Sequence, residues 1–382
     1  MHRAVIEYDR TVSYVEADLL LLNIARARHH RPVHFTAVSS VAATFDFRVS
    51  SGLNASLVRS AVPDGSVDPL TLQLSTSVAE NPTITIIPIA GEEFTKRILR
   101  PLDESHFDFL VRQGFDINMI LRLMARGIAI DGEETPTILF NSPSRKEEYT
   151  EFRRRLLHLA SLDFTKKLRI GSIMYEEAYP VALDRAMTPA EVVAALDKGY
   201  RWTTPGKDQP AILSRKVTGR ITMTNYDVHR LNNEERRRLN EEIERFSPDH
   251  VFVDIRPGSP GGEYPLRGFI LLRSFNSIIS FVARGIAEEP GYHVDKDPRT
   301  GPVLRNPAHV LEIEESSTRL PDAEFSVEFE GKHYAIRKFP ITEGMEPSWN
   351  QEAFAVLSDL FQMTVTDISN VKTPIISIPK GG

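Results

Sequence analysis

Residues 7–51 read EYDRTVSYVEADLLLLNIARARHHRPVHFTAVSSVAATFDFRVSS, and this stretch decides the fold. In its first part, apolar residues recur at three- and four-residue spacing, the period of an amphipathic helix. They are Tyr8, Val12, Val15, Leu19, Leu22 and Ala25, with Leu20, Leu21 and Ile24 widening the stripe. We therefore expect a helix packed on more than one side. Pro32 ends it, because proline has no N–H and its ring clashes with the preceding turn.

After Pro32 the apolar period changes to two, which predicts a strand with one polar face. The apolar positions are Val33, Phe35, Ala37, Val41, Ala43, Phe45, Phe47 and Val49. At ~3.3 Å per residue, residues 33–49 would span roughly 56 Å, against ~20 Å for an ordinary strand. Such a strand must bend, carry a bulge or extend out of its domain.

A second alternating run begins at Leu70, Leu72 and Leu74, and we expect it to break at Asn81 and Pro82 before residues 83–87. Residues 50–68 between the two runs are rich in Ser, Gly, Asn and Pro and predict a loop. The pattern favours a long antiparallel hairpin with an irregular tip. Two or more ordinary strands of a globular sheet remain the alternative.

Self-association through this hairpin follows as a hypothesis, because a long exposed strand offers unpaired N–H and C=O groups to a neighbour. The chain is expected to form a homo-oligomer, either a ring or a dimer. The predicted interface residues are Phe35, Val41, Phe45, Phe47, Leu70, Leu72 and Leu74.

The composition of the 382 residues, 41% hydrophobic and 26% charged, is typical of a globular protein of two or three domains. The net charge of -6 argues against nucleic-acid partners, because phosphate binding needs clustered cations. Arginine runs at residues 153–155 and 236–238 are interleaved with Glu on predicted helices. We interpret both runs as solvated helix faces.

The chain has no cysteine, which excludes disulfides, thiolate metal sites and cysteine nucleophiles. We expect no transmembrane helix and no signal peptide, since no long apolar stretch occurs and Met1 leads directly into the first helix. The expected location is therefore periplasmic or outer-membrane-associated if an export segment was removed, and otherwise cytoplasmic. Membrane association would then depend on a removed or missing amino-terminal anchor.

The predicted fold class is α+β, with an α+β domain over residues 1–165 and a mixed α/β domain over residues 166–382. Helices are predicted near residues 92–100, 103–111, 118–126, 146–162, 188–198, 232–246, 266–287 and 352–361. Strands are predicted near residues 136–140, 168–174, 220–224, 251–255, 310–314, 325–329, 334–337, 363–368 and 375–378, and a linker or exposed loop at residues 199–216. The helix over residues 266–287 has the strongest pattern, with Leu272 and Phe275 on its inner face.

One motif suggests chemistry. Residues 254–262 read DIRPGSPGG, a strand that runs into a loop, which resembles the oxyanion loop of Clp-type serine peptidases and their crotonase relatives. The resemblance implies backbone N–H groups of Gly261 and Gly262 directed at an oxyanion and Ser259 as the nucleophile. However, no small-residue turn leads into a serine on the following helix, and a structural turn explains the glycines equally well.

Metal and cofactor sites are not predicted. His29, His30 and His34 lie near one another, but adjacent helical histidines point in different directions and no carboxylate lies three or four residues away. Exposed histidines at a basic helix end are the simpler interpretation.

Several short stretches form a further pattern: residues 22–28 (LNIARAR), 32–40 (PVHFTAVSS), 81–84 (NPTI), 91–94 (GEEF) and 254–258 (DIRPG), with Arg273-Ser274 and the late hairpin around Tyr334. Together they resemble a family of uncharacterised exported proteins of proteobacteria, often predicted lipoproteins. The resemblance covers most of the chain and implies export to the cell envelope without an assigned activity. A signal peptide and a lipidated cysteine, which the pattern includes, are absent from this sequence.

Two classes of function therefore stand side by side. The first is a non-enzymatic envelope protein that acts by self-assembly or as a scaffold for envelope partners. The second is a serine hydrolase or peptidase that uses Ser259, Gly261 and Gly262.

Overall fold

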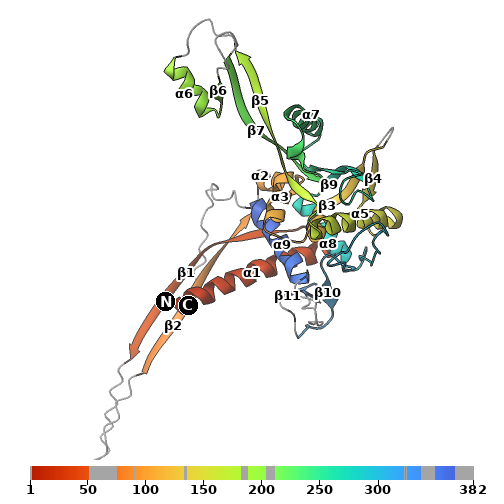
Figure 1. The fold of residues 1–382 in the computed structure, drawn as a ribbon. Helices are drawn as coiled ribbons and strands as arrows, with labels where there is room; N and C mark the ends of the chain where they lie inside the picture. Colours follow the sequence, from red (N-terminus) through yellow and green to blue (C-terminus); the bar gives the residue numbers. More distant parts are fainter. Residues whose placement is uncertain are drawn as a thin grey trace, which may run out of the picture. The chain divides into compact units, whose positions relative to one another are not determined.

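The computed structural model describes residues 2–50, 75–89, 91–132, 136–181, 188–203, 211–321, 323, 325–336 and 349–365. The chain has an α+β fold and divides into two compact units. Unit 1 comprises Met1–Glu16, His34–Ile89 and Val371–Gly382, and unit 2 comprises Ala17–Val33 and Ala90–Asn370. Figure 1 shows the elements of both units.

The first helix, α1 (His2–Arg28), confirms the helix predicted from the opening stretch. In its part that belongs to unit 2, Leu20, Leu21, Ile24 and Ala25 are buried. The chain leaves the helix through His30, whose φ of 54° is left-handed.

The predicted hairpin is confirmed. Strand β1 (Phe35–Ser50) pairs antiparallel with β2 (Ser75–Ile89), from Phe35 opposite Ile89 to Ser50 opposite Ser75, with a bulge between Val38 and Ser40. These strands form a two-stranded sheet of their own, so the alternative of ordinary strands in a globular sheet is wrong.

The predicted break at Asn81 and Pro82 is also wrong. Strand β2 continues through both residues, with Asn81 opposite Thr44 and Pro82 opposite Ala43. A proline can occupy an edge strand because the N–H that it lacks would face away from the partner strand.

Unit 2 is built on a seven-stranded sheet in the order β4-β3-β9-β8-β7-β5, with β6 paired to β7. All of its strand pairs are antiparallel except β7 with β8. The strands are β3 (Ala125–Ile130), β4 (Thr137–Phe140), β5 (Arg169–Val181), β6 (Arg201–Thr203), β7 (Ala211–Thr224), β8 (His250–Ile255) and β9 (Leu266–Leu272). The domain boundary predicted at residue 165 therefore falls inside one sheet, because β3 pairs with β9 across it.

The helix predicted over residues 266–287 is wrong in its first part. Leu266–Leu272 is strand β9, and the helix α8 (Phe275–Gly285) begins only after Ser274, whose side chain accepts from the Ser277 N–H. Strand β9 lies between β3 and β8 and is buried along most of its length, so its continuous apolar run carries no alternation. Gly268 permits the close pairing, since a Cβ there would lie 2.0 Å from the Ala129 carbonyl oxygen.

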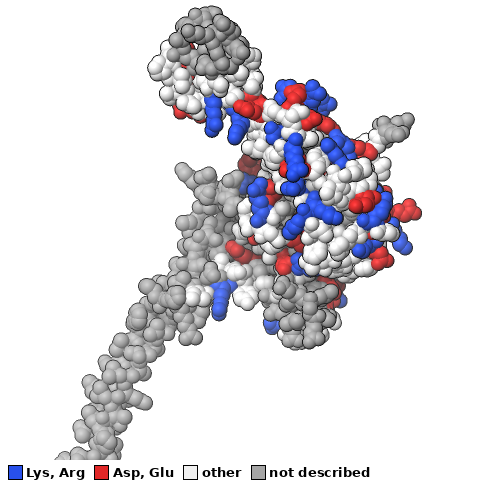
Figure 2. Space-filling view, in the orientation of Figure 1, with Lys and Arg blue, Asp and Glu red and all other residues white. Residues whose placement is uncertain are grey.

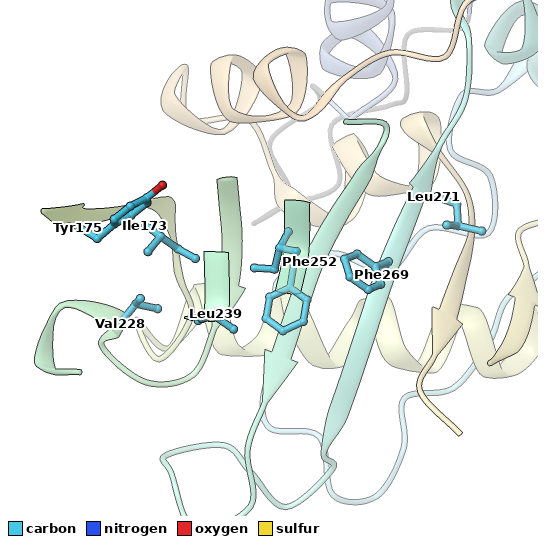
Figure 3. Packing of buried hydrophobic residues seen from close by; sticks show 8 residues of the cluster. Ile173, Tyr175, Val228, Leu239, Phe252, Phe269 and Leu271 are labelled. Atoms are coloured by element: carbon cyan, nitrogen blue, oxygen red, sulfur yellow. The ribbon is translucent and has the colours of Figure 1, made fainter. Parts of the chain in front are cut away.

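A hydrophobic cluster fills the space between this sheet and α7 (Asn233–Glu244) together with the short helix η1 (Val228–Arg230). Its members are Ile173, Tyr175, Val228, Leu239, Ile243, Phe252, Phe269 and Leu271. Figure 3 shows Phe252 and Phe269 on neighbouring strands with Leu239 beside them. The ring centroids of the two phenylalanines are 5.4 Å apart.

Beyond the cluster, β5 and β7 continue as a second ribbon, up to Val181 opposite Ala211. Strand β6 pairs with β7. Helix α6 (Pro189–Asp197) lies near the end of the ribbon (Figure 1), agrees with the helix predicted near residues 188–198, and starts at a capping box formed by Thr188 and Glu191. The linker predicted over residues 199–216 is wrong where the structure describes it, because residues 201–203 and 211–216 are in strands.

The remaining helices of unit 2 agree with the predicted ones. They are α2 (Glu92–Leu99), α3 (Glu104–Arg112), α4 (Ile117–Met124), α5 (Lys146–Phe164) and α9 (Trp349–Val365). Within the described residues, no helix is both long and apolar enough to cross a membrane.

A three-stranded sheet in the order β10-β12-β11 contains the predicted late hairpin. Its strands are β10 (Ile313–Ser316), β11 (Phe325–Phe329) and β12 (Lys332–Ile336). The strand predicted over residues 363–368 is wrong at its start, because Met363 lies in α9, and the strand predicted at residues 375–378 lies outside the described residues.

Truncation of Leu272 or Phe275 to Ala should lower the free energy of unfolding by about 2 to 5 kcal/mol, the usual range for large buried side chains. Leu272 is 1% exposed and Phe275 is fully buried, so either truncation leaves a cavity. Chemical denaturation of the two variants measures the effect. Leu304→Ala is the matched control, because Leu304 is 64% exposed, and an unchanged midpoint for both core variants would contradict the assignment.

Candidate functional site

The loop that follows β8 contains the motif that resembles an oxyanion loop. Asn225 holds the start of this loop at Arg256. Asn225 Oδ1 accepts from the Arg256 N–H at 2.9 Å, and Asn225 Nδ2 donates to the Arg256 carbonyl at 2.9 Å. Inside the loop, the Ser259 N–H donates to the Arg256 carbonyl at 3.4 Å and the Gly262 N–H donates to the Ser259 carbonyl at 2.9 Å. The Gly262 N–H is thus committed to a turn and does not face a ligand.

Close packing explains why glycine occupies positions 261 and 262 of the motif. Gly261 has a φ of 83°, and a Cβ on it would lie 2.0 Å from Leu162 Cδ2. A Cβ on Gly262 would lie 2.1 Å from the Arg256 carbonyl oxygen. Gly261 is therefore required for packing against α5, and Gly262 is required for the turn to close over Arg256.

The histidine that contacts this loop is His158 of α5, which is 3% exposed. Its Nε2 lies 2.9 Å from the Gly261 carbonyl oxygen, and its Nδ1 lies 3.3 Å from Thr300 Oγ1. Burial lowers the pKa of His158. The neutral ring therefore donates through Nε2 and accepts at Nδ1, and both nitrogens are used for structure.

Tyr264, at the end of the loop, is held by charged groups. Its hydroxyl donates to Glu151 Oε1, and its ring lies between the guanidinium groups of Arg155 and Arg299, 3.7 and 4.0 Å from the ring centroid. Burial, followed by the hydrogen bond to Glu151, raises the pKa of Tyr264. The phenol is consequently a hydrogen-bond donor at neutral pH and not a base.

Asp254, the last polar residue of β8, is 2% exposed. Its Oδ2 accepts from Tyr226 Oη at 2.9 Å, Arg256 Nε at 2.7 Å and Arg267 Nη1 at 3.3 Å. Oδ2 of the carboxylate thus receives three donors, two of them charged, as a buried charge requires. These contacts fix the end of the strand.

Two further buried cations hold the irregular segment that follows α8. Arg122 of α4 donates to the carbonyl oxygens of Pro307 and Ala308 at 2.8 and 2.7 Å. Arg153 of α5 donates to Asn306 Oδ1 at 2.7 Å. Burial lowers the pKa of Arg122 to about 9, and the charge of Arg153 adds to the effect.

The interpretation of residues 153–155 as a solvated face is therefore wrong for Arg153, which is fully buried. It holds for the second run, where Arg237 and Arg238 are exposed and contact Glu234 at 3.0 and 2.9 Å. On the face shown in Figure 2, Lys and Arg side chains alternate with Asp and Glu over the described surface.

The histidines at the end of α1 are partly engaged in contacts. His29 Nε2 lies 2.6 Å from Tyr334 Oη and its Nδ1 lies 3.1 Å from Glu330, so the expectation of a fully exposed histidine is wrong here. His30 is exposed. No group of His, Asp and Glu in the described parts of the chain could hold a metal ion.

A shallow pocket opens beside Arg122, and its empty space, solvent at the mouth included, is ≈ 370 Å³. Asn141, in its wall, donates to the carbonyl oxygens of Arg122 and Ala125 at 2.9 and 2.8 Å. Glu289, another wall residue, accepts from Ser142 Oγ at 2.9 Å. These polar groups already have protein partners and do not converge on a ligand.

The predicted interface residues fall into three groups. Phe35 lies at the base of β1 and is 3% exposed, so it is buried within the chain. Val41, Phe45 and Phe47 lie in β1, opposite Ile84, Glu80 and Val78 of β2. Leu70, Leu72 and Leu74 lie outside the described residues.

The structure thus brings Ser259, Gly261 and Gly262 into one turn, and among the described residues no hydrogen bond joins the Ser259 side chain to a base. Sequence reasoning missed His158, Asp254, Tyr226 and Arg267, which make the contacts around this loop. A histidine inside the apolar run of residues 156–162 was a usable signal for burial.

No protein-family model, no curated protein and no solved structure matches this chain.

Ser259 should not react as a nucleophile, because His158 is bonded elsewhere and the turn consumes the Gly262 N–H. Incubation with a fluorophosphonate probe should give no more labelling than in the Ser259→Ala variant. An active serine hydrolase serves as the positive control. Labelling of the unaltered protein that disappears in Ser259→Ala would contradict this interpretation.

Proposed function

We propose that this protein is a non-enzymatic, self-assembling component of the cell envelope, and that the β1–β2 ribbon is the element through which copies associate. The observation that supports the proposal is the isolation of the ribbon. In the described residues, β1 and β2 pair with each other and with no further strand, over a register from Phe35 to Ser50.

Within the described part of the chain, no further strand pairs with either outer edge of the ribbon. At ~3.3 Å per residue, a pair of this length offers roughly 50 Å of unpaired N–H and C=O groups on each side. Such an edge recruits another strand unless it is covered. Addition of strands across an edge is a general mode of protein recognition, in which main-chain hydrogen bonds supply the affinity.

The alternating sequence of β1 supports the same proposal. Phe45 and Phe47 occupy alternate positions with Val41 and Val49, so one face of the strand carries apolar residues. A two-stranded sheet by itself is marginally stable in water, and further strands on the same apolar face would stabilise it.

The envelope part of the proposal rests on the sequence resemblance alone, which begins with residues 22–28 and 32–40 and covers most of the chain. A scaffold for envelope partners is the corresponding role. Hydrolysis at Ser259 is not proposed beside it, because the loop geometry supplies neither a base nor a free oxyanion donor from Gly262.

Sedimentation velocity at micromolar concentration tests the assembly. We expect an oligomer for the unaltered protein and a monomer for the double variant Phe45→Lys/Phe47→Lys, because lysines on this face remove apolar contact and repel one another between copies. The matched control is Val193→Lys/Leu196→Lys on α6, where both side chains are 55% exposed, and this variant should keep the oligomer.

A monomer for the unaltered protein over the whole micromolar range would remove the proposal. Loss of the oligomer in both double variants would assign the effect to added charge instead of to the ribbon.

A further inference from the structure

The two edges of the β1–β2 ribbon differ in their capacity to donate hydrogen bonds. Strand β2 contains Pro82 and Pro88, whereas β1 contains no proline between Phe35 and Ser50. Since proline has no N–H, the donors on the two edges are not equivalent.

The register assigns these prolines to one edge. In an antiparallel pair, successive residues direct their N–H groups alternately toward the partner strand and toward the outer edge. Proline is tolerated where its nitrogen faces the outer edge. Pro82 and Pro88 are six positions apart in β2, an even number, so the nitrogens of both face the outer edge.

The β1 residues opposite this alternate series of β2 residues also direct their N–H and C=O groups toward the outer edge. The residues opposite Thr76, Val78, Glu80, Pro82 and Ile84 are Val49, Phe47, Phe45, Ala43 and Val41. All five of these β1 residues have an N–H. The outer edge of β1 is therefore an uninterrupted row of donors and acceptors beyond the bulge, and the outer edge of β2 is interrupted.

We propose that the occupant of the β1 edge is the β1 edge of a second copy of this chain, paired antiparallel about a two-fold axis. This inference rests on the proposed assembly function and specifies its geometry. The result is a continuous four-stranded sheet in the order β2-β1-β1-β2, with the proline-containing strands outermost.

A ring is the competing arrangement. It requires β1 of each copy to pair with β2 of the next, which is a head-to-tail contact. Pro82 and Pro88 would then leave acceptors of the neighbouring strand without donors, and each unpaired group weakens the contact. In the two-fold arrangement the same prolines face solvent and oppose further strand addition.

The charges of β1 favour pairing with a second copy of this chain, and they favour one register of that pairing. Asp46 and Arg48 are two residues apart in β1. In the pairing that is symmetric about Phe47, Asp46 lies opposite Arg48 of the partner subunit, and the reverse pair forms by symmetry. A pairing symmetric about Asp46 would instead place the two aspartates opposite each other, which is unfavourable.

Cysteine cross-linking tests the inference directly, because the natural chain has no cysteine. At the symmetry centre, Phe47 faces Phe47 of the partner subunit at a Cα separation of about 5.5 Å, within the range that a disulfide spans. Mild oxidation of Phe47→Cys should give a covalent dimer and nothing larger. The matched variant Val78→Cys, at the paired position of β2, should stay uncross-linked.

The outcomes separate the inference from the proposed function. A non-covalent assembly larger than a dimer, with Phe47→Cys left uncross-linked, would overturn the two-fold arrangement and keep the assembly function. A dimer that cross-links through Val78→Cys instead of Phe47→Cys would also overturn it. A monomer that does not cross-link would remove both.

Charge reversal checks the register. Asp46→Arg or Arg48→Asp alone should weaken the dimer about tenfold, since like charges then face each other in both symmetric pairs. The double variant Asp46→Arg/Arg48→Asp restores opposite charges and should return the dissociation constant to within about threefold of the original. Failure of the double variant to recover, with its hairpin still folded by circular dichroism, would overturn this register.

Discussion

The main constraint on this structure is that a backbone N–H or C=O group removed from water must find a hydrogen-bond partner. The sheet of unit 2 meets it by pairing strands side by side and by adding side-chain donors where regular structure ends. In unit 1, no further strand pairs with the outer edges of β1 and β2 within the described residues. The proposed assembly supplies the missing partners for β1 from another copy.

Unit 2 shows how the same requirement shapes what first resembles an active site. Asn225 satisfies both main-chain groups of Arg256, His158 satisfies the Gly261 carbonyl, and Arg122 satisfies the carbonyls of Pro307 and Ala308. Each of these polar side chains is buried. A buried polar group with all its partners rigidifies a turn, whereas a catalytic group must keep a free donor or acceptor for the substrate.

Much of the fold could be predicted because local patterns and tertiary contacts agree. The helix–Pro32–strand opening, the Thr188 and Asn232 helix caps and the late hairpin at Glu330 and Gly331 all depend on neighbours in sequence. The strand β9 could not be recognised, because Phe269, Leu272 and Phe275 fit a helical spacing while partners far along the chain hold the segment in the sheet. The spacing of apolar residues does not distinguish a helix from a strand where the segment is buried on all sides.

The contacts of the candidate site were harder to predict than the fold. Arg153 lies in a charged run, which is typical of a protein surface. Its burial depends on the segment around Asn306, and no local sequence pattern connects that segment to α5. Similarly, Oδ2 of Asp254 accepts from Tyr226 and Arg267, which come from separate parts of the sheet unit. Such polar networks depend on the assembled tertiary structure, so a motif such as residues 254–262 predicts a turn better than it predicts chemistry.

Residue-resolved amide hydrogen exchange on β1, measured at concentrations above and below self-association, tests the central claim most directly. We predict that the outward amides of Phe45, Phe47 and Val49, which the pairing about Phe47 covers, are protected only at the higher concentration. The alternate amides of Ala42, Thr44 and Asp46, which face β2, should be protected at both and provide the internal control. Exchange of the outward amides at the same rate at both concentrations would contradict the account.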